Sequence, residues 1–338
     1  MVTKHASSHY VSIRGLRYHY RQWDVAGNQL APEQAALKEA ARSDAPVTNA
    51  VTTSAATMNA ATMNAAITVG AHGPSTPLVL LHGWMDVGAS FQFMVDALNV
   101  PRRVIALDWR GFGLTDWAAA DSYWFPDYLA DLDALLHSVS PVAPVDLVGH
   151  SMGGNVACLY AGIRPARVRR LVNLEGFGLS AQPATLAVAR YGRWLDEVGQ
   201  TQRLRDYADF AALADRLRRD NPRLSADRAA WLARHWAQEL PDGMVRLRAD
   251  PAHKRINPVR YRLDEAIACW QAVRAPVLWV DGVDSLTPGQ LQLSAQDLAE
   301  RRAHFHNLRW HAIADCGHML HHDQPEALAD LLQGFLAD

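Results

Sequence analysis

The ten residues 145–154, VDLVGHSMGG, decide the fold. They begin with an apolar run of strand length, Val145 to Val148, and a helical pattern follows the last glycines. A serine between a strand and a helix lies on a sharp, strained turn that projects its hydroxyl, and the flanking glycines are needed because side chains there would clash. Gly149 and Gly153 occupy those positions. The stretch therefore predicts that Ser151 lies on a tight strand-to-helix turn.

Five further apolar runs of strand length surround this turn, and helical stretches lie between them. The expected strands are Leu78 to Leu81, Val104 to Leu107, Val168 to Leu174, Val277 to Val280 and Leu308 to Ile313. The expected helices include Ser90 to Leu98, Tyr123 to Ser138, Met152 to Ile163 and Pro325 to Leu336. Short runs buried on both faces, alternating with amphipathic helices, predict an α/β fold with a mostly parallel sheet covered on both faces. Ligands of such sheets bind beyond the carboxyl ends of the strands.

Two segments depart from this alternation near the N-terminus. Residues Tyr10 to Trp23 alternate apolar and polar side chains around Gly15, which predicts a hairpin. Residues 24–76 contain one amphipathic stretch, Pro32 to Arg42, and a tandem repeat of ATMNA within 56–65. The rest of this segment has neither helical nor strand periodicity. We interpret residues 24–76 as a mobile low-complexity insertion.

A third segment, Gly176 to Arg274, shows no convincing strand and is rich in Arg, Trp and Ala. Its helical stretches are Leu186 to Val198, Ala211 to Arg219 and Ala226 to Glu239. We expect an inserted all-helical cap at 176–274, between the two parts of the core at 1–175 and 275–338. A mild excess of basic residues in the cap suits anionic substrates or a solvated helix surface equally well. Four tryptophans could line a cavity there, although helical spacing favours packing: Trp194, Trp231, Trp236 and Trp270.

A serine hydroxyl needs a base that takes its proton as it attacks. The candidate base is His318, because the loop that follows the last expected strand lands on the same rim of the sheet as Ser151. His321 and His322 follow closely, and three histidines at this spacing could also suggest a metal site. No Asp, Glu or Cys cluster accompanies them, so we expect no metal there.

A catalytic histidine also needs a carboxylate that fixes its tautomer and stabilises the imidazolium. Two candidates follow strands that end at the same rim, Asp284 and Glu175. The chain order Ser151, Asp284, His318 is the usual one for this topology, so Asp284 is preferred and Glu175 is the alternative acid.

Acyl transfer places negative charge on the former carbonyl oxygen, which requires preorganised donors. The backbone amides of Met152, after the serine, and Trp84, after the first parallel strand, are the expected donors. The Trp84 side chain either packs in the core or lines the pocket.

The composition and the absence of certain motifs argue against several classes of function. The net charge is -2, which gives no field for nucleic acid or an anionic membrane. Three scattered cysteines and a polar N-terminus predict a reducing, cytoplasmic location. No phosphate-binding loop and no dinucleotide fingerprint occur, so we expect no organic cofactor. The expected partner is a small-molecule acyl substrate, and the sequence does not indicate an oligomeric state.

These motifs resemble the α/β-hydrolase fold superfamily. His82-Gly83-Trp84 is similar to its oxyanion segment, 108–113 (DWRGFG) to its D-x-R-G-x-G loop, and 149–154 to its nucleophile turn. The run His82 to Asp86, with Ser90-Phe91 after it, resembles the serine hydrolase-like branch. The resemblance implies Ser151 as nucleophile, His318 as base and an acid in the Asp284 loop, with a helical lid at 176–274. The acid loop departs from the family pattern, because Asp281 stands where a glycine is usual, and some relatives place the acid where Glu175 stands.

The expected activity is therefore a cofactor-independent serine hydrolase that cleaves a carboxylic ester or a related acyl compound through an acyl-enzyme. The same turn also serves thioesterases, amidases and carbon-carbon hydrolases. The alternatives are a cofactor-free peroxidase, haloperoxidase or dioxygenase on the same fold, and a receptor that binds small molecules without catalysis.

Overall fold

The computed structural model describes residues 3–24, 76–99 and 101–337. The expected insertion at 24–76, with its amphipathic stretch and its repeat, lies outside the described residues apart from its two end positions.

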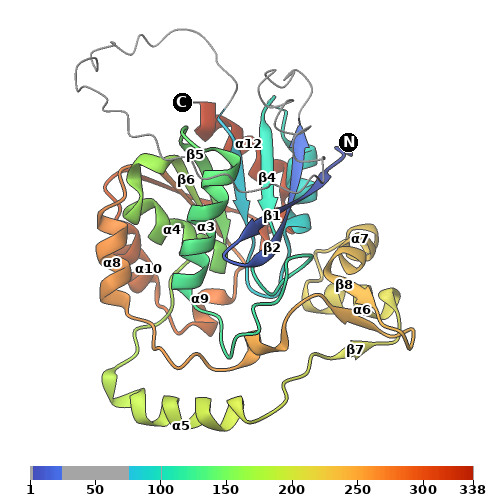
Figure 1. Ribbon diagram of the computed structural model, residues 1–338. Coiled ribbons are helices and arrows are strands. Elements are labelled where there is room, and N and C mark those ends of the chain that lie inside the picture. Colours follow the sequence, from blue (N-terminus) through green and yellow to red (C-terminus); the bar gives the residue numbers. More distant parts are fainter. Residues whose placement is uncertain (1–2, 25–75, 100, 338) are drawn as a thin grey trace, which may run out of the picture.

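An eight-stranded sheet forms the centre of the protein (Figure 1). Its strands are β1 (Ser7–Ile13), β2 (Leu16–Asp24), β3 (Leu78–Leu81), β4 (Arg103–Leu107), β5 (Val145–His150), β6 (Val168–Leu174), β10 (Val277–Gly282) and β11 (Leu308–Ile313). They are arranged in the order β1-β2-β4-β3-β5-β6-β10-β11. All pairings from β4 to β11 are parallel, whereas β1, β2 and β4 pair antiparallel. The predicted α/β class with a mostly parallel sheet is confirmed.

Helices cover both faces of this sheet (Figure 1). One face packs against α3 (Phe125–Val139), α4 (Met152–Ile163), α8 (Leu263–Gln271) and α10 (Ala295–Ala303). The other packs against a short 3-10 turn, η1 (Gly88–Phe91), and against α2 (Gln92–Ala97), α11 (Leu320–Asp323) and α12 (Pro325–Ala337). Alternate residues of each central strand point to opposite faces, so Val79 and Leu81 join one apolar cluster while Leu78 and Leu80 join the other. This is why the central strands have continuous apolar sequences.

The last strand is less buried than the sequence suggested. In β11 only Ile313 is fully buried, and Arg309, Trp310 and His311 are exposed. The expectation that every strand is buried on both faces is therefore wrong for β11, because this strand forms the edge of the sheet and pairs only with β10.

The N-terminal hairpin is confirmed. Its turn places Arg14 and Gly15 at φ 49° and 81°, a conformation that glycine adopts without cost. The strand β2 then adds to the sheet beside β4.

The segment expected as an all-helical cap contains strands as well as helices. Its helices are α5 (Ala187–Val198), α6 (Phe210–Asp220) and α7 (Ala226–Trp236). Three short strands, β7 (Asp206–Tyr207), β8 (Ala237–Glu239) and β9 (Val245–Leu247), form a small antiparallel sheet beside α6 and α7. The expectation of an all-helical cap is therefore wrong. Helix α8, also expected in the cap, packs against α4 of the core, because Ala266 and Trp270 are buried in the core cluster.

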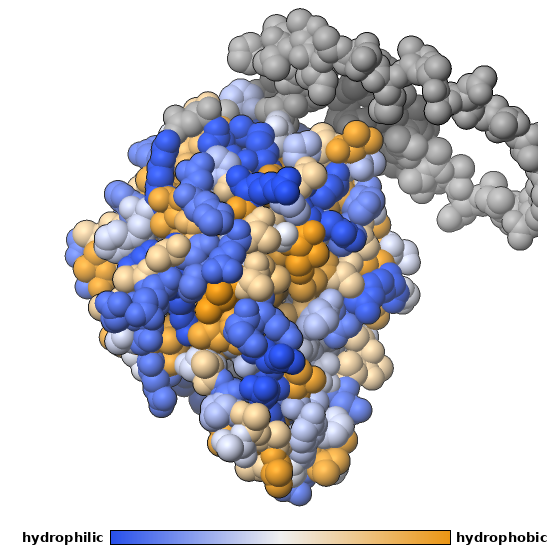
Figure 2. Space-filling model, turned by 90° about the vertical axis from the view of Figure 1, so that its left-hand side faces the viewer, coloured by the Kyte–Doolittle hydropathy of each residue, from blue (hydrophilic) through white to orange (hydrophobic). Residues whose placement is uncertain are grey.

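Helix α5 stands apart from the other elements in Figure 1, and none of its residues is fully buried. On the face of the molecule shown in Figure 2, hydrophilic and hydrophobic residues are interspersed. No helix of the described residues has the length and apolar character needed to cross a membrane.

Candidate active site

Ser151 lies on the predicted tight turn between β5 and α4. Its backbone has φ 53° and ψ -116°, a strained conformation for a residue with a side chain. The turn leaves no room for larger neighbours. A Cβ on Gly149 would lie 2.3 Å from the Gly153 oxygen, and a Cβ on Gly153 would lie 2.2 Å from the Leu81 oxygen. Both glycines are required because backbone atoms, which cannot rotate away, fill the space.

We therefore expect Gly149→Ala to lower the free energy of unfolding by about 3 kcal/mol, the upper end of the usual cost of overpacking. Gly192→Ala on the exposed α5 is the control, since a Cβ added to Gly192 would meet nothing within 4 Å. Gly192→Ala should leave the free energy of unfolding unchanged or raise it slightly, because alanine favours a helix more than glycine does. Chemical denaturation of both variants measures the difference, and equal stabilities would show that the turn tolerates a side chain.

His318 is held by a buried carboxylate. Its Nδ1 lies 2.7 Å from Oε2 of Glu175, which is 1% exposed and follows β6 directly. The same carboxylate accepts hydrogen bonds from the Gly282 amide at 2.8 Å and from the Ser285 hydroxyl at 2.5 Å. These bonds tie the ends of β6 and β10 to the histidine loop, and they fix the carboxylate in one position.

Asp284, the preferred acid of the sequence analysis, does not contact His318 in the structure. Its carboxylate pairs with Arg223 at 2.6 Å and is 42% exposed. The guanidinium of Arg223, which follows α6, holds this side chain at the surface, while the Asp284 backbone amide donates to the Cys316 oxygen. Glu175, the alternative acid, therefore occupies the position that was expected for Asp284.

Ser151 and His318 line one cavity of about 240 Å³, together with Gly83, Trp84 and Trp236. A second cavity, of about 430 Å³, is also lined by Ser151, together with Glu175. Most of its wall is aromatic or apolar, contributed by Trp84, Tyr123, Trp124, Phe125, Tyr128, Phe177, Leu179, Tyr261 and Leu291. Both cavities lie at the carboxyl ends of the strands, as predicted.

The two expected oxyanion donors, Trp84 and Met152, both line the larger cavity. Neither backbone amide donates a hydrogen bond to another described residue. The Trp84 side chain is 54% exposed, so it lines the pocket and does not pack in the core.

No sequence motif assigns a role to His150, which precedes Ser151. Its Nε2 donates to the backbone oxygen of His318 at 2.8 Å, so it holds the histidine loop against the strand. Burial, followed by the nearby His321 and His318, lowers the pKa of His150 well below its usual value. The residue is therefore neutral at physiological pH.

The four tryptophans expected in the cap have different surroundings. Trp270 is buried and stacks on Phe305, while Trp231 and Trp236 pack at the edge of the cap cluster. Trp236 also lines the smaller cavity, and none of the four lines the larger one. The aromatic lining of the larger cavity comes mainly from the segment around α3, where sequence spacing gave no signal for a pocket.

The loop 108–113 has a structural role. Asp108 accepts hydrogen bonds from the Gly88 amide and from His19, and Arg110 pairs with the buried Asp131. Through these contacts, the loop 108–113 holds the N-terminal hairpin against the core.

Comparison with known proteins agrees with this fold. The family model of the alpha/beta hydrolase fold matches residues 76–325. A serine hydrolase-like protein of Danio rerio is 25% identical over 279 residues, covering 78% of this chain and 83% of that protein. A 2-hydroxymuconate semialdehyde hydrolase of Pseudomonas sp. (strain CF600) is 28% identical over 277 residues, covering 79% and 88%. The thioesterase domain from the curacin biosynthetic pathway shares the fold with a TM-score of 0.76 at 21% identity, covering 98% of this chain and 99% of that chain. The chain belongs to the alpha/beta hydrolase fold family and is a hydrolase.

Proposed function

We propose that the protein hydrolyses a carboxylic ester or a related acyl compound through an acyl-enzyme on Ser151, with His318 as base and Glu175 as acid. One observation carries this proposal: His318 lies in the same cavity as Ser151 while its Nδ1 bonds the buried Glu175 carboxylate. A carboxylate can only accept, so Nδ1 carries the proton and the Nε2 lone pair is free to take the proton of a serine.

The reaction follows from these positions. The Ser151 oxygen attacks the acyl carbon as its proton passes to Nε2 of His318, and Glu175 stabilises the imidazolium that forms. The Met152 and Trp84 amides stabilise the negative oxygen of the tetrahedral intermediate. His318 then returns the proton to the leaving group. A water molecule, activated by the same imidazole, releases the acid and restores the serine.

The larger cavity favours substrates with an apolar or aromatic group. Its volume of about 430 Å³ lies within the ordinary range of small-molecule pockets. Polar side chains, among them Gln182, Arg190 and Arg255, also line it, so a polar group of the substrate can be held beside the apolar one. We expect activity to rise with the size of the acyl or aryl group until the cavity is filled.

A fluorophosphonate probe tests the proposed nucleophile, because its phosphorus is attacked only by an activated serine and fluoride leaves. We expect one adduct per chain, which peptide mass spectrometry places on Ser151. Prior incubation with an aryl ester should compete with labelling. An unlabelled protein would contradict the proposal and would favour a receptor with an idle serine. Oxygen or peroxide consumption, without release of an acid from esters, would favour an oxidative reaction instead.

A further inference from the structure

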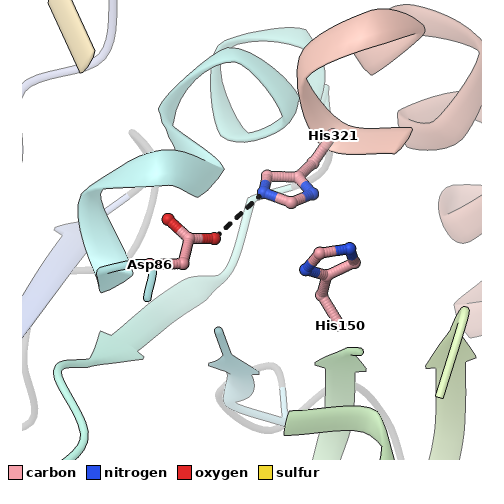
Figure 3. Close-up of side chains that lie close together, drawn as sticks. All are labelled: Asp86, His150 and His321. Atoms are coloured by element: carbon pink, nitrogen blue, oxygen red, sulfur yellow. Dashed lines mark ion pairs between the residues drawn. The ribbon is translucent and has the colours of Figure 1, made fainter. Parts of the chain in front are cut away.

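Three buried side chains, Asp86, His150 and His321, lie close together in a cluster (Figure 3). Asp86 comes from the loop after β3, His150 from the end of β5 and His321 from α11. Their exposed fractions are 3%, 1% and 0%, and their candidate ligand atoms all lie within 4.8 Å of one another.

Each side chain offers the cluster a polar atom that is not hydrogen-bonded to a described residue. Oδ1 of Asp86 accepts from the Val87 amide and the Ser90 hydroxyl, but Oδ2 has no hydrogen-bond partner. His150 donates its Nε2 proton to the His318 oxygen, which leaves an unpaired Nδ1. Both ring nitrogens of His321 lack a hydrogen-bond partner. Buried polar atoms without partners are costly and rare, so their gathering at one point calls for a shared partner.

Hydrogen bonds between the three side chains do not satisfy this cluster. Nε2 of His321 lies 3.7 Å from Oδ2 of Asp86, beyond hydrogen-bond distance, and Nδ1 of His150 has no hydrogen-bond partner among the described residues. A metal cation, in contrast, accepts one lone pair from each of the three side chains. The hydrogen bond from the second nitrogen of His150 to a carbonyl is also the support that metal-bound histidines usually have.

We propose that Asp86, His150 and His321 bind a divalent first-row transition metal ion of the Zn²⁺ class. Two imidazoles and one carboxylate are a ligand set that such ions take, with an open position left for water. Ligand atoms of a tetrahedral zinc ion lie about 3.4 Å apart, given metal-ligand bonds of about 2.1 Å. Binding therefore requires the three atoms, which lie within 4.8 Å of one another, to move closer to that spacing.

The smaller cavity provides an entry path and room for the open position, because Asp86 and His150 line it together with Ser151. The site uses none of the three residues proposed for the acyl-enzyme reaction. Metal binding can therefore be tested independently of hydrolysis.

The test is titration of the chelator-treated full-length protein with Zn²⁺ in a calorimeter, and with Co²⁺ followed by visible absorption. We expect one saturable ion per chain, a Co²⁺ spectrum of low coordination number and a higher Tm with Zn²⁺. His321→Gln and Asp86→Asn should each weaken this binding at least tenfold. Ser151→Ala should bind as the parent does.

His322→Gln is the matched control, since His322 is also buried on α11 with an unpaired Nε2 but lies outside the cluster. It should retain the bound ion. Near-ultraviolet circular dichroism establishes that each variant is folded. The proposal is overturned if the parent binds no ion, or if folded His321→Gln and Asp86→Asn bind Zn²⁺ as tightly as the parent.

Discussion

Ser151→Ala is expected to lower kcat for a nitrophenyl ester by roughly 10⁴-fold to 10⁶-fold, the loss that follows removal of a triad nucleophile. The reason is that alanine has no oxygen to form the acyl-enzyme, while the proposed oxyanion donors, the backbone amides of Trp84 and Met152, remain. KM should change little, because the aromatic walls of the larger cavity do not depend on the hydroxyl. Steady-state kinetics with a series of aryl esters measures both constants.

The matched control for this variant is Ser12→Ala, on the edge strand β1 and exposed to solvent. It should retain parental kinetics. A Ser151→Ala protein that hydrolyses the ester at the parental rate would show that another group performs the chemistry.

Glu175→Gln is expected to lower kcat/KM by roughly 10³-fold to 10⁴-fold, whereas Asp284→Asn should stay within about threefold of the parent. The glutamine keeps the shape of the side chain but carries no charge to stabilise the His318 imidazolium. Asp284→Asn breaks only an exposed ion pair with Arg223, and such pairs contribute about 0.2–1 kcal/mol to stability.

Both variants should be measured against the same ester, with thermal unfolding as the control for folding. Equal losses in the two would indicate that the loops, not the carboxylate, control activity. A large loss of kcat/KM confined to Asp284→Asn would indicate that Asp284, in the loop after β10, is the acid.

The tight turn at Ser151 could be predicted from the sequence, whereas the carboxylate that contacts His318 could not, and the reason is physical. The turn at Ser151 is determined locally, by glycines that adjacent backbone would otherwise strike. The choice between Glu175 and Asp284 depends instead on contacts between distant segments. Arg223, more than sixty positions from Asp284, turns that carboxylate outward, and no local pattern shows this.

The short strands of the cap could not be predicted from the sequence, for a similar reason. The cap strands β7, β8 and β9 have two or three residues each, too few to show a period of two. These strands are stabilised by their pairing with one another in the small sheet of the cap. The sequence of β11 has apolar residues at both ends, as a buried strand would. The strand is exposed because it lies at the edge of the sheet.

The buried cluster of Asp86, His150 and His321 could not be predicted from the sequence either. In the sequence, His321 stands beside His318 and His322, and this spacing alone suggests a site made of the three histidines. The structure instead gathers His321 with Asp86, from the loop after β3, and with His150, from the end of β5. Only the tertiary arrangement reveals a carboxylate among the histidines.

The most direct test of the central claim, that Glu175 holds His318 for Ser151, is NMR of protein labelled with ¹⁵N-histidine. We predict a low-field, exchange-protected Nδ1 proton of His318, assigned by its loss in His318→Gln. It should persist in Asp284→Asn and disappear in Glu175→Gln. A resonance that survives in Glu175→Gln and vanishes in Asp284→Asn would contradict the account.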